Sequence, residues 1–518
     1  MYTFHPRCNY YIGELQKILF KTKDFSKIND LITSAESFIG DKISVSYLLI
    51  FSCLGKFYGI LINNDPKFDT PSNKKKAFYY FRTCLDLLSS NDIKNENNSE
   101  INILKMDVYI GYANILYTCE RKIAAIRYYR NVLEIDPNNN MARANLGCVL
   151  SRFTSQLEIN STLATNSIAD DDILYLKNTA YHYLQSGIND NNTFIHKDAK
   201  DMFLYTIKYY KLQEYPLNNV YYPQIIDNNI EENRYRHWCL DKHLFLNALN
   251  DIFEKEYFFA CDKIELPSIL VKKREQPIVY TLFNQIKEEY IYSRYILYTS
   301  SIKNIRSHFA DKYTLLINDE YNYSIRLEEL KTCFRRLYSI FDKIAFFINI
   351  YWDLGIKEQD ISFKSIWFKK HTGKKSYSYK NILHCNSSAL TALKWINADF
   401  QDSFSENSKP RYKKINLLRN ALEHKFINIH SKFNVDIYQD ENYNIYHISE
   451  DILYQYTLDL MYIVREAIIE LTLAVKYEEL IKLRSKTTFN NIKNIPLKEY
   501  KDYNKSVPHV KRVACTSL

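Results

Sequence analysis

The chain has 518 residues, of which 46% are hydrophobic, a formal net charge of +9, and only 9 Gly and 11 Pro. The hydrophobic fraction permits a packed core, and the scarcity of turn-forming residues argues against an all-β fold and favours long helices joined by short loops. No Gly-rich phosphate-binding loop occurs in the sequence, which argues against nucleoside triphosphate hydrolysis and dinucleotide redox chemistry.

The ten Cys are scattered and never form a Cys-x-x-Cys pair, so we expect free thiols in a reducing cytoplasm, no metal site and no cofactor. The N-terminus lacks a basic segment followed by an apolar run, and the longest apolar stretches, 47–62 and 344–352, are too short to span a bilayer. We therefore expect a cytoplasmic protein without membrane contact. The mild positive charge is compatible with a polyanionic partner but is spread over a long chain.

The first third of the chain carries pieces of the tetratricopeptide pattern, in which small residues mark the contact between two helices and an aromatic residue follows one turn later. The matching positions are Gly55 with Tyr58, Ala77 with Phe81, Ala113, Ala125 with Tyr129, and Gly147. We expect residues 40–170 to resemble a tetratricopeptide solenoid, within a helical repeat domain that spans 1–215. Such stacked repeats serve as a scaffold and bind a protein or peptide partner on their concave face.

Residues 216–283 are expected to connect the repeats to the rest of the chain. Within them, residues 234–253 are dense in aromatic and charged side chains, which favours a packing segment. His237 and His243 invite a metal-site interpretation, but their six-residue separation is not that of a helical ligand pair.

Residues 284–485 are predicted to form a helical bundle, followed by a basic tail over 486–518. Apolar spacing predicts five helices in the bundle, at 284–309, 326–354, 387–400, 411–430 and 449–484. Between the last two, residues 433–448 alternate about a polar turn and predict a small β-hairpin. The predicted fold class is therefore all-α, with a repeat solenoid followed by a bundle that carries a small hairpin.

The fourth predicted helix carries the candidate site. Apolar residues recur in it at helical spacing and form one stripe. The stripe consists of Ile415, Leu418, Leu422, Phe426 and Ile429. Asn420 and His424 fall on the opposite face one turn apart, and Arg419 lies at the edge of that face. A guanidinium, an amide and an imidazole on one surface can hold a phosphate and move a proton.

Further candidates near this helix each allow two interpretations. Asp342, on the second predicted helix, lines the same cleft as His424 or belongs to a solvated flank. Glu423 supports the site, or neutralises Arg419 in a surface ion pair one turn away. The insertion at 356–380 interleaves lysines with aromatic residues such as Trp367, which suits contact with single-stranded RNA but is also typical of a solvated loop. Its candidate contacts are Lys369, Lys370, Lys374, Lys375 and Tyr377.

The segment 419–424, Arg-Asn-Ala-Leu-Glu-His, resembles the Arg-Asn-x-x-x-His motif of the HEPN family (higher eukaryotes and prokaryotes nucleotide-binding). Its late position in a five-helix domain agrees with this family. The sequences at 235–251, 341–345 and 465–468 resemble a bacterial HEPN branch in which the domain follows tetratricopeptide repeats.

The resemblance implies metal-independent RNA cleavage by a homodimer, in which two copies of the motif face each other. His424 would act as general base or acid, Arg419 would hold the scissile phosphate, and Asn420 would orient either of them. The products would be a 2′,3′-cyclic phosphate and a 5′-OH. HEPN proteins of this kind resemble toxins or antiviral defence effectors. The alternatives are a non-catalytic module for protein interaction and dimerisation, and nucleotide binding or transfer, which the missing Gly-rich loop and paired carboxylates disfavour.

Overall fold

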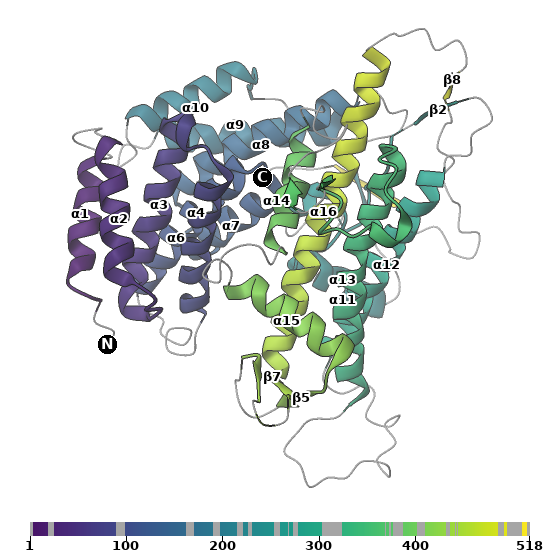
Figure 1. Cartoon of the computed structure of the whole chain (residues 1–518). Coiled ribbons are helices and arrows are strands. Elements are labelled where there is room, and N and C mark those ends of the chain that lie inside the picture. The colour runs from purple at the N-terminus through teal and green to yellow at the C-terminus, as the bar shows by residue number, and fades with distance from the viewer. Residues whose placement is uncertain are drawn as a thin grey trace. The chain divides into compact units, whose positions relative to one another are not determined.

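The computed structural model describes residues 4–18, 25–89, 99–161, 170–189, 197–214, 221–225, 230–252, 260–267, 269–272, 278–302, 324–367, 369–371, 374–376, 387–400, 410–430, 436–440, 442, 444–484, 492–494 and 510–514. The chain divides into two compact units. Unit 1 comprises Met1–Ser155, Leu174–Tyr215 and Gln401–Tyr412, and unit 2 comprises Gln156–Ile173, Pro216–Phe400 and Lys413–Leu518. Helices dominate the described parts of both units, which confirms the predicted all-α class (Figure 1).

Unit 1 is built from consecutive helices joined by short connections. Its α-helices are α1 (Arg7–Lys17), α2 (Ile28–Ile39), α3 (Leu48–Asn64), α4 (Pro71–Leu88), α6 (Ser99–Thr118), α7 (Lys122–Ile135), most of α8 (Asn140–Ser161), most of α9 (Asp170–Ile188) and α10 (Lys197–Tyr209). Short 3-10 helices η2 (Phe25–Lys27), η3 (Val45–Tyr47) and η4 (Pro66–Phe68) lie between them. Neighbours pack in pairs, α3 against α4 and α6 against α7, as the repeat pattern predicts.

The ring of Phe81 on α4 packs against two glycines on neighbouring helices. A Cβ on Gly55 of α3 would lie 2.8 Å from the ring, and a Cβ on Gly111 of α6 would lie 2.5 Å from it. On α8, a Cβ on Gly147 would meet the backbone oxygen of Ala180 at 3.0 Å. The expectation that small residues mark helix contacts is therefore confirmed at Gly55 and Gly147.

Helix α3 is the core helix of unit 1. The expectation that the stretch 47–62 is too short to span a bilayer is wrong. With η3, α3 forms Val45–Asn64, which is long and apolar enough to cross a membrane by length and composition, but 67% of its most apolar window is buried inside the protein. Its apolar length is explained by packing, because a helix that is apolar on all sides is found in a protein core as well as in a bilayer.

Unit 2 is organised around one long helix, α16 (Glu450–Arg484). The other helices are α11 (Ile230–Asp241), α12 (Ile278–Ser301), α13 (Ile325–Tyr351), α14 (Ser388–Asp399) and α15 (Pro410–His424), with 3-10 helices η5 (Ala248–Asp251) and η8 (Glu358–Asp360). Every residue of α16 from 463 to 476 is buried, and α12, α13 and α14 pack against it (Figure 1). Its predicted start is confirmed, since the hydroxyl of Ser449 accepts the backbone N–H of Ile452 at 3.4 Å.

Short strands accompany the bundle. Three antiparallel pairs are β1 (Tyr221–Ile225) with β9 (Val510–Ala514), β2 (Leu270–Lys272) with β8 (Ile492–Asn494), and β3 (Lys369–His371) with β4 (Lys374–Ser376). A three-stranded sheet has the order β5 (Ile427–His430), β7 (Tyr446–Ser449), β6 (Tyr438–Gln439), in which β7 pairs parallel to β5 and antiparallel to β6. The predicted hairpin is thus present as β6 and β7, and the expected connector and tail also contribute strands.

The predicted extent of the fourth bundle helix, 411–430, is wrong at its end. Helix α15 ends at His424, and residues 427–430 form β5. The β-branched Ile427 and Ile429 alternate with polar residues, which fits a strand as well as a helix. Backbone pairing with the distant strand β7 decides between them. Phe426 consequently leaves the apolar stripe and is 80% exposed, while Ile429 is buried from the sheet.

Candidate functional site

Helix α15 presents its polar face outward. Ile415, Leu418 and Ala421 are at most 1% exposed, so this side of the helix is fixed against the bundle by apolar burial. Asn420 and His424 are exposed on the other side. The predicted amphipathic arrangement is therefore present over the part of the segment that is helical, and the motif residues are accessible to a ligand.

Arg419 is oriented by an amide and an aromatic ring. Its Nη1 donates to Oδ1 of Asn420 at 3.1 Å, and its guanidinium carbon lies 5.5 Å from the centre of the Tyr338 ring. No ion pair joins Arg419 to Glu423 or to another carboxylate among the described residues. The positive charge of Arg419 is thus positioned without being neutralised. In this structure Glu423 does not form the ion pair with Arg419 that was one of its two interpretations.

Tyr338 on α13 supports Arg419, and it is not among the site residues predicted from the sequence. Its hydroxyl donates to Oδ1 of Asn416 at 3.0 Å, and its ring packs edge-on against Phe341 and Phe400. These contacts hold the ring in place beneath the guanidinium. The available signal was the spacing of Tyr338 from Phe341, which puts them on neighbouring positions of one helical face.

The structure does not bring Asp342 to His424. Arg335 on α13 donates to the carbonyl of Leu422 at 3.4 Å, so this turn of α13 lies beside the end of α15. Asp342 stands seven positions further along α13, roughly 10 Å away at the helical rise. Its Oδ1 accepts the backbone N–H of Phe363 at 2.9 Å, which makes it a support for the turn that follows η8.

His424 is the last residue of α15 and is exposed. Among the described residues its ring has no hydrogen-bond partner, so both ring nitrogens are open to a substrate. The chain then turns directly into the sheet, because the carbonyl of Phe426 accepts the backbone N–H of Tyr446 at 3.0 Å. The imidazole is therefore carried by a backbone that is fixed on both sides.

The lysine-rich insertion is a hairpin over part of its length. β3 and β4 place Lys369 opposite Ser376, Lys370 opposite Lys375, and His371 opposite Lys374. Their side chains and Tyr377 lie outside the described residues. Trp367 does not fit the prediction of an aromatic residue open to RNA. It is 2% exposed, and its ring packs edge-on against that of Phe363, with 6.0 Å between the ring centres.

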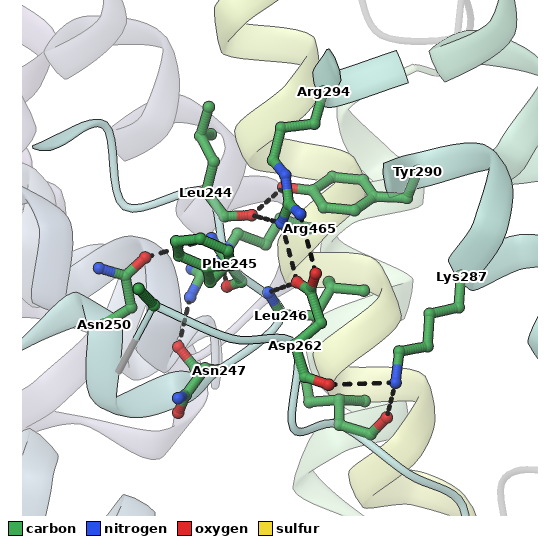
Figure 2. A network of polar contacts seen from close by, with 12 residues as sticks. Leu244, Phe245, Leu246, Asn247, Asn250, Asp262, Lys287, Tyr290, Arg294 and Arg465 are labelled. Atoms are coloured by element: carbon green, nitrogen blue, oxygen red, sulfur yellow. Dashed lines mark hydrogen bonds and ion pairs between the residues drawn. The ribbon is translucent and has the colours of Figure 1, made fainter. Parts of the chain in front are cut away.

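A buried polar network holds the segment before α12 onto the bundle (Figure 2). Arg294 on α12 binds both carboxylate oxygens of Asp262 at 2.8 Å and donates to the carbonyl of Leu244 at 3.1 Å. Burial by itself raises the pKa of Asp262, but the charge and hydrogen bonds of Arg294 outweigh it, so the pKa is lowered. The second arginine, Arg465 on α16, binds Asp251 in the same bidentate way.

This network is closed to substrate, since Arg294 and Arg465 are each 2% exposed. It joins residues from 235–251 to 465–468, two of the sequences on which the family resemblance was based. His243 also belongs to it structurally, because its Nδ1 lies 2.7 Å from the carbonyl of Asn250. Among the described residues no group of three His, Cys, Asp or Glu side chains is arranged to hold a metal ion.

Residues 270–478 match the family model described as LA2681-like HEPN. The matched region runs from β2 into α16 and includes the whole of α15 with its motif. No curated protein and no solved structure matches the chain.

Proposed function

With residues 270–478 identified as a HEPN domain, we propose that this chain is a metal-independent endoribonuclease whose site is the exposed face of α15. One observation carries the proposal: the guanidinium of Arg419 is held by Asn420 and by the Tyr338 ring, and no carboxylate of the described residues pairs with it. A cation that is positioned but not neutralised suits the binding of a phosphodiester.

The proposed reaction is a transesterification within RNA. His424 removes the proton from a ribose 2′-OH, and the 2′-oxygen attacks the adjacent phosphorus. The bond from phosphorus to the 5′-oxygen breaks, and the leaving oxygen takes a proton from a protonated imidazole. The products are a 2′,3′-cyclic phosphate and a 5′-OH, with no water consumed and no change of oxidation state. Arg419 binds the non-bridging oxygens as charge develops on them.

A homodimer would complete this site. One copy of α15 supplies a single imidazole, whereas the reaction uses one general base and one general acid. We propose that two HEPN domains pair with their α15 faces opposed, so that each contributes one His424. Sedimentation of the purified protein tests this, and a monomer at the concentrations at which RNA is cut would contradict it.

Cleavage itself is tested with mixed RNAs in the presence of EDTA, which removes contaminating metal-dependent nucleases. We expect fragments whose 5′ ends accept phosphate from a kinase directly and whose 3′ ends are cyclic phosphates. His424→Ala and Arg419→Ala are expected to lose about 10²- to 10⁴-fold and about 10²- to 10³-fold of the rate. His182→Ala, an exposed histidine of unit 1, serves as the control.

Unchanged cleavage by folded His424→Ala would overturn the proposal. The complete absence of cleavage by the wild type, with an intact dimer, would favour the non-catalytic interaction module. We further propose that the protein is a cytoplasmic toxin or antiviral defence effector whose helical repeats dock a protein or peptide. Induced expression in bacteria should stop growth for the wild type and not for His424→Ala, and equal growth arrest by both would contradict this role.

A further inference from the structure

Phe426 stands apart from the other described phenylalanines. It is 80% exposed, and it is the only exposed Phe in the described part of the chain. A single exposed apolar side chain has no meaning by itself. Phe426 is of interest because it lies two residues after His424, the last residue of the motif.

The ring of Phe426 is carried two residues beyond His424. Consecutive Cα atoms are 3.8 Å apart, so the two Cα atoms are at most about 7.6 Å from each other. The backbone of Phe426 is fixed, because its carbonyl accepts the N–H of Tyr446 and the following residues pair with β7. An aromatic ring on a fixed backbone loses little freedom when a flat ligand stacks on it.

The surroundings of Phe426 are charged and aromatic. Glu423, His424 and Lys425 are all exposed, and Arg419 lies five residues before His424 on α15. Interface cores between protein subunits are depleted of such charges. With two α15 faces opposed, we therefore assign this ring to the RNA bound between them and not to the core of the contact between the two copies. A single nucleic-acid strand is bound by such a combination, because cations contact its phosphates and an exposed ring stacks on one of its bases.

The sheet continues this surface away from His424. Alternation along β5 puts Asn428 and His430 on one face, and Phe426 directly precedes β5 with its carbonyl bonded to the N–H of Tyr446. Asn428 lies opposite His447, which lies opposite Tyr438 on the other side. The Tyr438 ring is stacked on His447 with 4.9 Å between centres, and Tyr438 is itself 49% exposed. A strand that leaves the motif across this face meets a second exposed ring.

We infer that Phe426 stacks on an unpaired base next to the phosphate held by Arg419, and so selects single-stranded or looped RNA. The inference rests on the proposed function for RNA as the ligand. A base within a duplex is already stacked on both sides and offers no face to Phe426.

The test measures binding separately from cleavage. The probe is a single-stranded 2′-O-methyl RNA with 2-aminopurine in place of adenine, which cannot be cut because its 2′-oxygens are blocked. The wild type is expected to bind the probe and quench 2-aminopurine, and the same RNA annealed to its complement is expected to compete poorly. Phe426→Ala should bind about 5- to 150-fold more weakly, with the quenching lost.

Two variants serve as controls. Phe426→Tyr keeps a stacking ring and should retain binding, and Tyr205→Ala removes a ring that is 63% exposed in unit 1 and should change nothing. Unaltered binding and quenching by Phe426→Ala, or equal competition by the duplex, would overturn the inference. A lower sedimenting mass of Phe426→Ala would overturn it too, because the ring would then pack against a second copy. Probe binding without cleavage of ordinary RNA would contradict the proposed function alone.

Discussion

Arg465 and Asp251 are 214 positions apart in the chain and form a bidentate ion pair, with both N–O distances 2.8 Å. The two side chains are only 2% and 5% exposed. Such a pair is tolerated in a core when its remaining donors are satisfied, and Arg465 also donates to the carbonyls of Phe245 and Asn247. The segment before the matched HEPN region is thereby fastened to α16, which agrees with the packing segment predicted for residues 234–253.

Removing one partner of this pair should strongly destabilise unit 2. Asp251→Ala leaves the Arg465 guanidinium buried and uncompensated, and we expect the free energy of unfolding to fall by about 3–5 kcal/mol. Arg465→Lys should not behave like the wild type, because an ammonium group cannot reproduce the two parallel hydrogen bonds. Urea denaturation of the full chain, followed by circular dichroism, measures the effect.

The control for that experiment is the pair Lys414 and Asp436, whose side chains are 32% and 45% exposed. Exposed pairs contribute at most about 1 kcal/mol, so Lys414→Ala should leave the urea midpoint nearly unchanged. Equal effects of Lys414→Ala and Asp251→Ala would contradict the role given to burial.

The lowered pKa of Asp262 should make the free energy of unfolding depend on pH. Burial alone would raise its pKa, but Arg294 lowers it below the ordinary value of 3.8. The unfolded chain then takes up a proton at a higher pH than the folded chain does, so the stabilisation is full well above pH 3.8 and is lost as the pH falls toward the lowered pKa.

The comparison with Asp262→Asn isolates this group. The difference in unfolding free energy between wild type and variant should be constant from neutral pH to about 5 and should shrink below about 4. Urea titrations over this pH range measure it. A difference that grows on acidification would show that Asp262 is protonated more readily in the folded protein, contrary to its contacts with Arg294.

The sequence predicts those features of the fold that depend on local patterns. Apolar spacing gives the buried side of α15, and the start of α16 follows from Ser449. The end of α15 could not be predicted, because residues 427–430 suit two structures and a strand about twenty positions later decides between them. The burial of Trp367 could not be predicted either, because the lysines around it are typical of a surface. Its ring packs against Phe363, which in turn contacts Phe341 on α13.

The candidate site shows the same division. Helical spacing alone is enough to place Asn420 and His424 on a common face, with Arg419 at its edge. The position of the Tyr338 ring beside Arg419 depends on how α13 and α15 pack together, which no local pattern contains. Helical spacing also leaves open whether Glu423 forms an ion pair with Arg419. The sequences at 235–251 and 465–468 resemble a family branch, but the ion pair between Asp251 and Arg465 that joins them is visible only in the fold.

Tyr338 is expected to act as a positioning residue if the proposed cleavage occurs. Tyr338→Ala removes the ring beneath Arg419, a contact worth about 0.5–1 kcal/mol at an exposed site, so kcat should fall by about 2- to 5-fold. Tyr338→Phe keeps the ring and loses only the hydrogen bond to Asn416, and should lie closer to the wild type. Initial rates on one RNA, with KM determined separately, compare them. A larger loss in Tyr338→Phe than in Tyr338→Ala would assign the effect to the hydroxyl instead of the ring.

The close packing in unit 1 predicts opposite effects of one substitution at two helical glycines. A Cβ on Gly111 would lie 2.5 Å from the Phe81 ring, whereas a Cβ on Gly13 in α1 meets nothing within 4 Å. Alanine is favoured over glycine inside a helix by roughly 0.5–1 kcal/mol. We therefore expect Gly13→Ala to raise the melting temperature slightly and Gly111→Ala to lower it, because overpacking costs about 1–3 kcal/mol. Adding Phe81→Leu should restore part of the loss in Gly111→Ala, since a smaller side chain makes room for the methyl group. Equal stabilisation by both alanines would show that the three helices around Phe81 do not approach as closely as the structure has them.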